Sequence, residues 1–162
     1  MAICNYMPTI IALLLMSVHP VFASSSADPT DCLIAAGLNP ISSNSTSYAN
    51  DSLTFNHRLL FKPVDIVFPA DASGVAKAVK CASEANVSVT ARSGGHSYAS
   101  NSAGGKNGSL VVDLKNLTTV ILNNTTAVFG TGIRLGNLAL ELFNGGERAM
   151  AHGKFFRVTA IH

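Results

Sequence analysis

The segment from residue 65 to residue 91 constrains the fold most, because it contains a strand, a helix and a second strand in that order. Asp65-Ile66-Val67-Phe68 lies between two prolines and predicts a short strand. Residues 71–86 predict a helix that Ser73 can cap, with an apolar face at helical spacing formed by Val75, Ala78, Val79 and Ala82. Residues 87–91 predict the second strand. This order favours a βαβ unit with a parallel pair of strands.

The flanking segments place this unit in a mixed fold. Before it, residues 31–36 predict a short helix capped by Asp28 or Thr30, and residues 39–56 predict a loop. After it come a glycine-rich loop (92–108), a strand (110–114), a hairpin (119–123 and 126–130) and a helix (134–143) that Gly145-Gly146 ends. Since the α/β part precedes the antiparallel part, the predicted class is α+β.

The first 27 residues differ from the rest, because all 20 charged residues (11 basic plus 9 acidic) follow Ala27. The apolar run 10–16 has the length of a signal-peptide core, and we expect cleavage after Ala23. The alternative is a buried core helix. The run is shorter than the roughly 20 residues of a membrane span. The net charge of +2 and the lack of a dense basic block argue against a nucleic-acid partner.

Cysteines and glycosylation sequons favour a secreted, extracellular protein. Cleavage removes Cys4 and leaves Cys32 and Cys81, which predict one disulfide in a secreted chain; the alternative is two unrelated buried thiols. Seven Asn-x-Ser/Thr sequons follow the cleavage site, and two of them overlap at Asn123-Asn124. The predicted glycosylation sites are Asn44, Asn50, Asn86, Asn107, Asn116 and Asn123.

Most known nucleotide-binding, catalytic and metal-binding motifs do not match this sequence, because a required residue is missing at the required spacing. Residues 130–135 have Leu135 where a dinucleotide fingerprint needs its third glycine, and residues 105–107 lack the Ser or Thr of a phosphate-binding P-loop. There is no Gly-x-Ser-x-Gly elbow, and His152 and His162 lack the neighbours of a metal site, so we expect no metal.

The segment Arg92-Ser93-Gly94-Gly95-His96-Ser97-Tyr98 directly follows a predicted strand. Paired glycines let the backbone approach a ligand closely, and successive N–H groups can bind an anion. The residues therefore predict a pyrophosphate-binding turn that carries an imidazole. The alternative is a surface loop with an incidental histidine.

This segment resembles the flavin-attachment loop of secreted FAD-linked oxidases of the vanillyl-alcohol-oxidase type, above all the berberine-bridge-enzyme-like branch and the fungal glucooligosaccharide oxidases. Residues 62–69 resemble the strand that opens their PCMH-type FAD-binding domain, and residues 132–136 resemble its second cofactor loop. Cys32 and Cys81 stand where fungal members form a disulfide. The resemblance runs from about residue 28 to residue 153.

The resemblance implies a covalent bond between His96 and the 8α-methyl group of FAD. It also implies cofactor contacts from both loops, namely Arg92, Ser93, Gly94, Gly95, Ser97, Tyr98, Gly132, Arg134 and Gly136. Family members oxidise a carbohydrate or alcohol hydroxyl and pass the electrons to dioxygen. We therefore expect a small molecule or oligosaccharide and dioxygen as partners, with the substrate itself undetermined.

The resemblance breaks after Gly153. Members with a second, thioether link continue His-Gly-x-Cys, whereas Phe155 occupies the cysteine position here, so we expect no second link. The expected organisation is a signal peptide (1–23), an N-terminal helix and loop (24–56), a partial FAD-binding domain (57–153) and an aberrant tail (154–162). The tail fits translation through an intron; the alternative is a divergent short protein.

On this interpretation the chain is the N-terminal fragment of an oxidase. It contains the first subdomain of the FAD-binding domain and the start of the antiparallel second subdomain. It carries no catalytic base and is inactive alone. The alternative function is a non-catalytic secreted flavin-binding or glycoprotein fragment.

Overall fold

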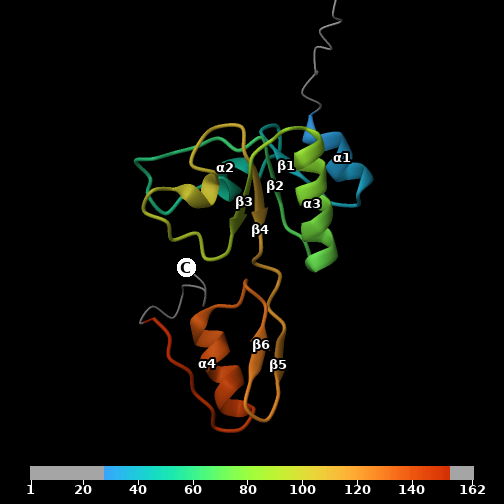
Figure 1. The fold of residues 1–162 in the computed structure, drawn as a ribbon. Helices are drawn as coiled ribbons and strands as arrows, with labels where there is room; N and C mark the ends of the chain where they lie inside the picture. The colour runs from blue at the N-terminus through green and yellow to red at the C-terminus, as the bar shows by residue number, and fades with distance from the viewer. Residues whose placement is uncertain (1–27, 154–162) are drawn as a thin grey trace, which may run out of the picture.

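The computed structural model describes residues 28–153, and the first part of this range is built on a four-stranded sheet (Figure 1). The strands are β1 (Ile41–Ser42), β2 (Asp65–Val67), β3 (Val89–Arg92) and β4 (Leu110–Asp113), in the order β1-β2-β4-β3. β2 and β3 both run parallel to β4, whereas β1 is antiparallel to β2. The predicted βαβ unit is present, but β4 lies between its two strands. The prediction that β2 and β3 pair with each other was therefore wrong. The order of strands in the sequence does not show that a later strand, β4, lies between them.

The helices α1 (Pro29–Ala35) and α3 (Ala72–Glu84) lie side by side against this sheet (Figure 1). The Asp28 carboxylate caps α1 by accepting a hydrogen bond from the Thr30 N–H. Asp71, and not Ser73, caps α3, with its Oδ1 2.7 Å from the Gly74 nitrogen. The prediction of Ser73 was wrong, since the helix begins at Ala72, two residues before the start that a cap at Ser73 implies.

The loop predicted over residues 39–56 contains two short elements, β1 and α2 (Tyr48–Asp51). Elements of two and four residues are too short to leave a periodic pattern in the sequence. A 3₁₀ turn, η1 (Asn101–Ala103), likewise lies inside the glycine-rich loop.

The main core lies between α1, α3 and one face of the sheet. It is formed by Leu33, Val67, Ala78, Cys81, Ala82, Leu110 and Val112, all nearly inaccessible to solvent. Every residue of β2 and β4 is buried, as expected for parallel strands covered on both faces. Val79, predicted on the buried face of α3, is 45% exposed. The buried face is rotated toward Cys81, because this residue joins α3 to α1.

A disulfide between Cys32 and Cys81 links α1 to α3, with the two Cα atoms 5.6 Å apart. The predicted pairing is thus confirmed. Next to it, the Thr30 hydroxyl lies 2.6 Å from Oδ2 of Asp65, a carboxyl at the start of β2 that is fully buried. Burial raises the pKa of the Asp65 carboxyl; the Thr30 hydrogen bond opposes this rise, and the charge of Asp28 adds to it.

The second part of the chain is an antiparallel hairpin packed on one helix (Figure 1). The hairpin, β5 (Val120–Leu122) and β6 (Ala127–Phe129), pairs Val120 with Phe129. The helix α4 (Leu135–Asn144) buries Leu135, Leu138 and Leu142 and ends at Gly145. These elements confirm the predicted hairpin and helix, and the whole forms the predicted α+β fold.

Gly130 and Gly132 let two backbone segments lie very close together where the two parts of the chain meet. A Cβ atom on Gly132 would lie 2.0 Å from the Leu114 carbonyl oxygen, and one on Gly130 would lie 2.1 Å from that of Leu117. No side chain fits at these distances, so the two positions require glycine. The Ser93 hydroxyl donates a hydrogen bond to the carbonyl oxygen of Thr131, which lies between them. The loop after β3 and the loop before α4 are therefore in direct contact.

Several predictions concern residues outside the described range: the signal peptide, the loss of Cys4, and the tail with Phe155. Among residues 28–153, no helix has the length and apolar character needed to cross a bilayer.

Candidate functional site

A cavity of about 300 Å³ lies at the carboxyl ends of β3 and β4. Its wall includes five consecutive residues of the predicted binding turn, Arg92, Ser93, Gly94, Gly95 and His96. Asp113 is the last residue of β4, Lys115 follows that strand, and Arg134 precedes α4. The remaining wall comes from α2 and residues 53–55. Parallel strands commonly bind ligands at this end, because the loops that follow them meet there.

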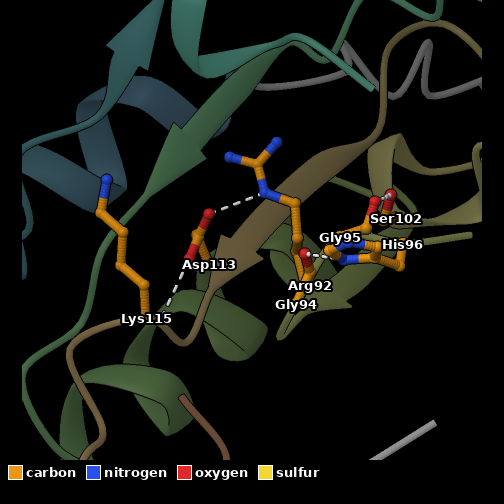
Figure 2. Close-up of polar contacts among 7 residues, drawn as sticks. All are labelled: Arg92, Gly94, Gly95, His96, Ser102, Asp113 and Lys115. Carbon is orange, nitrogen blue, oxygen red and sulfur yellow. Dashed lines mark hydrogen bonds and ion pairs between the residues drawn. The ribbon is translucent and has the colours of Figure 1, made fainter. Parts of the chain in front are cut away.

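Arg92 is held in place by Asp113, which lies opposite it in the register of β3 and β4. Arg92 Nε lies 2.7 Å from Asp113 Oδ2, and each side chain is only 9% exposed. Asp113 Oδ1 accepts a hydrogen bond from the Lys115 N–H at 2.9 Å. The two terminal nitrogens of the Arg92 guanidinium point away from Asp113 (Figure 2). Asp113 therefore orients Arg92 while leaving those donors for a ligand.

Sequence reasoning identified Arg92 but missed Asp113. The sequence placed both residues near strand ends, because Arg92 directly follows the predicted strand 87–91 and Asp113 is the last residue but one of the predicted strand 110–114. This signal could not be used, since only the three-dimensional strand order makes β3 and β4 neighbours.

The turn after Arg92 presents the His96 imidazole. Gly95 has a φ of +72°, a backbone conformation that favours glycine. The Nδ1 atom of His96 lies 2.9 Å from the Gly94 carbonyl oxygen (Figure 2). A carbonyl oxygen only accepts, so in this hydrogen bond Nδ1 carries the proton and Nε2 holds the lone pair of the neutral ring.

Phe55 packs against the same imidazole. The ring centroids of Phe55 and His96 are 4.7 Å apart with an interplanar angle of 31°. Tyr98 meets Phe55 edge-on, with centroids 5.3 Å apart. Sequence reasoning missed Phe55, and its position in a predicted loop offers no signal that would reveal the contact.

The predicted cofactor residues divide into two groups. Six line the cavity: Arg92, Ser93, Gly94, Gly95, His96 and Arg134. Ser97, Tyr98, Gly132 and Gly136 are not part of its wall. Ser97 accepts a hydrogen bond from the Asn101 N–H, Tyr98 is 77% exposed, and Gly132 packs on the backbone of Leu114. Gly136 lies in the first turn of α4. Cofactor contact by these four residues stays a prediction.

The sequence from residue 63 to residue 159 matches a family described as "FAD binding domain". This match covers more than half of the chain. The chain belongs to this FAD-binding family.

Relatives with known activities include fungal carbohydrate oxidases. The chain is 39% identical to a chitooligosaccharide oxidase from Gibberella zeae over 138 residues, which is 81% of this chain and 28% of the relative. A solved xylooligosaccharide oxidase from Myceliophthora thermophila, in complex with xylobiose, has a TM-score of 0.77 and 39% identity, covering 82% of this chain and 28% of that one.

A glucooligosaccharide oxidase from Acremonium strictum, described as carrying 6-S-cysteinyl, 8α-N1-histidyl FAD, has a TM-score of 0.77 and 34% identity. That match covers 82% of this chain and 28% of the oxidase. The chain thus spans about a quarter of the length of the relatives it matches. These neighbours share its PCMH-type fold.

The residues of the cavity fit an anionic part of FAD. Three cationic side chains line it (Arg92, Lys115 and Arg134) against two carboxylates (Asp51 and Asp113). Asp113 is paired with Arg92, and the Lys115 ammonium lies 3.7 Å from the ring centroid of Phe68, a residue outside the cavity wall. Arg92 and Arg134 are therefore the cationic residues that suit an anion in this cavity. A volume of about 300 Å³ is at the lower end for ligand pockets, so these residues suit one portion of the cofactor rather than its whole length. Among residues 28–153, no group of three metal-ligating side chains comes together.

Proposed function

We propose that this cavity binds the pyrophosphate part of FAD and that His96 forms a covalent bond to the flavin. In that step a ring nitrogen of His96 would replace one hydrogen of the flavin 8α-methyl group, and the two electrons released would pass to dioxygen. The observation that carries the proposal is the placement of Arg92 to His96, five consecutive residues, along one wall of a cavity that Arg134 also lines. The histidyl-FAD named for the similar glucooligosaccharide oxidase supports His96 as the attachment residue.

The residues have separate roles in this proposal. The Arg92 terminal nitrogens, oriented by Asp113, and the Arg134 guanidinium neutralise the phosphates. Gly94 and Gly95 let the backbone approach the cofactor, and Ser93 fixes the turn through Thr131. When bound, FAD would supply the redox chemistry, accepting a hydride from the substrate and giving electrons to dioxygen. Ser97, Tyr98, Gly132 and Gly136 are proposed as further contacts.

We propose that the protein acts as part of an oxygen-dependent oxidase of carbohydrate or alcohol hydroxyls. The names of the relatives support an oligosaccharide as substrate. In this proposal the described residues hold the cofactor, and residues outside them supply the substrate contacts and the base. With Phe155 at the cysteine position, His96 provides a single covalent link.

Covalent flavin content tests this proposal directly. The purified chain is incubated with FAD and precipitated in acid, and the pellet is examined for flavin absorbance and for the mass of one added FAD. We expect acid-stable flavin on the wild type and none on His96→Ala, which keeps the non-covalent site. A wild-type pellet without flavin, together with no FAD binding by fluorescence titration, contradicts the proposal.

Turnover is a separate measurement. Peroxide formed from xylobiose or chitobiose by the flavin-loaded protein supports oxidase activity. A yellow, acid-stable protein without peroxide instead supports a flavin-binding fragment without turnover.

We also propose that the protein is secreted and glycosylated. The six predicted acceptors, Asn44, Asn50, Asn86, Asn107, Asn116 and Asn123, are all exposed, which supports this role. They are not equivalent, because Asn50 lines the cavity, Nδ2 of Asn116 donates to the Phe68 carbonyl at 3.2 Å, and Nδ2 of Asn123 donates to the Thr126 hydroxyl at 3.4 Å. A glycan competes with each of these arrangements, so we expect the lowest occupancy at these three sites. Peptide mapping after expression in a secreting fungal host checks the order.

A further inference from the structure

We propose that Phe55 is a positioning residue that fixes the orientation of the His96 imidazole before FAD arrives. This inference rests on the proposed function, since it assigns a role in covalent attachment at the same site. It concerns a residue outside the binding turn, more than forty positions earlier in the chain.

The backbone around Phe55 is anchored on both sides. The Asn56 side chain donates from Nδ2 to the Tyr98 carbonyl at 2.8 Å and accepts from the Arg58 N–H at 3.0 Å. Thr54 is 4% exposed, and its hydroxyl donates to the Asn56 carbonyl at 2.9 Å. Because Asn56 ties this turn to the residues that follow His96, Phe55 is held against the binding turn by its own backbone.

Two restraints act on the imidazole, and they act on different degrees of freedom. The Gly94 carbonyl, 2.9 Å from Nδ1, sets which ring edge faces the turn. Phe55, with its centroid 4.7 Å away, sets the plane of the ring. Tyr98 supports Phe55 from the side at an interplanar angle of 88°. Together they select one side-chain conformation of His96 among its staggered alternatives.

Phe55 also lines the cavity and is 47% exposed, so burial of its own ring contributes little to the core. A half-exposed aromatic ring that stacks on the proposed attachment residue is better explained by a role at the site. Loss of such an aromatic pair shifts a conformational equilibrium by roughly two- to tenfold.

Covalent attachment depends on this orientation, because the reacting ring nitrogen must stay aligned with the bound partner. We expect Phe55→Leu to slow the formation of acid-stable flavin about tenfold. Because Phe55 lines the cavity, the non-covalent affinity for FAD falls as well, but by less than the attachment rate, since the proposed phosphate contacts of Arg92 and Arg134 remain. Phe55→Tyr keeps the stacking ring and restores the wild-type rate.

The test compares Phe55→Leu and Phe55→Tyr with Phe143→Leu, a matched control. Phe143 lies on α4, is 61% exposed and does not line the cavity. The first readout is the proton–carbon spectrum of histidine-labelled protein without FAD, with the His96 signal assigned from His96→Ala. Stacking on Phe55 shifts this signal upfield, and only Phe55→Leu removes the shift. The second readout is the rate of acid-stable flavin formation.

The outcomes separate this inference from the proposed function. Wild-type attachment with an equal rate in Phe55→Leu overturns the positioning role and leaves the proposed function standing. A wild type that takes up no FAD overturns the proposed function. In that case a His96 signal that stays at its wild-type position in Phe55→Leu also overturns the positioning role, whereas a signal that moves downfield from that position supports it. A slow rate in both Phe55→Leu and Phe143→Leu overturns the specific role of Phe55.

Discussion

The two parts of the chain differ in how they are held together. The sheet region (residues 28–114) buries every residue of β2 and β4 and is crosslinked by the disulfide between α1 and α3. The hairpin region (residues 115–153) has a small core cluster of three buried residues, Ile133, Leu138 and Leu142, and α4 also buries Leu135. Both hairpin strands alternate between half-buried and exposed residues. One region therefore has a core enclosed on both sides, and the other has a core on one side only.

This difference bears on the proposed site, because both regions contribute to it. Most of the cavity wall belongs to the sheet region, and Arg134 comes from the hairpin region. The Ser93–Thr131 hydrogen bond joins the two. A two-stranded hairpin on one helix is marginal by itself. We therefore expect the sheet region to position His96 and Arg92 firmly, and the placement of Arg134 to depend on the weaker region.

The largest expected effect comes from removing the disulfide. The double variant Cys32→Ser, Cys81→Ser opens a loop closed across 49 residues, and in the chain-entropy model this costs about 4 kcal/mol of unfolding free energy. Hydrogen exchange should show lost protection in α1, α3 and β4, with little change in α4. Equal losses in both regions contradict the distinction, because they mean that the two unfold as one unit.

Leu138→Ala tests the other region. Leu138 is 1% exposed in the middle of the hairpin core, and a buried Leu→Ala change costs about 3 kcal/mol. We expect β5, β6 and α4 to lose amide protection while β2 and β4 keep theirs. Leu140→Ala, on the exposed side of α4 at 62%, is the matched control and should change little. A loss of protection in β4 with Leu138→Ala shows that the sheet region depends on the hairpin region.

Asp65 gives a further test of the difference between the two regions, because it makes the stability of the sheet region depend on pH. Burial raises the pKa of this carboxyl in the folded chain. The folded state therefore binds the proton more tightly than the unfolded state. The stabilisation is complete below the unfolded pKa of about 4 and is lost as the pH rises through the folded pKa. Asp65→Asn does not titrate, so the wild type should gain stability relative to the variant as the pH falls from 7 to 3.

Urea unfolding of both proteins at pH 3, 5 and 7 measures this difference. Titrating groups remote from Asp65 cancel because both chains carry them, whereas Asp28, whose charge acts on Asp65, is compared in a second pair of proteins that both carry Asp28→Asn. The effect is expected to be smaller than the two losses above and confined to the sheet region. A constant difference across the pH range contradicts the raised pKa of Asp65.

Particular residues show how much of this the sequence could predict. The hairpin, α3, α4 and the Cys32–Cys81 bond follow from local patterns and from cysteine chemistry, and the structure has them all. The loop from Arg92 to His96 was recognisable because its glycines serve a local turn. Asp113 and Phe55 were not, because each meets its partner only through strand order or through the packing of a loop. Residues that act by positioning other residues therefore could not be predicted from local sequence patterns.

The smallest expected effect concerns the outer face of the hairpin region. Ile121 and Val128 are direct cross-strand partners and are 56% and 60% exposed. The double change Ile121→Thr, Val128→Thr keeps β-branched side chains, so the unfolding free energy should fall by only about 0.5 kcal/mol. Exposed apolar pairs favour association, and light scattering should show less self-association than for the wild type. The matched change Val79→Thr, at 45% exposure on α3, should leave association unchanged. If Val79→Thr reduces self-association as much, exposed apolar side chains of both regions cause the association. The one-sided core of the hairpin region is then not its cause.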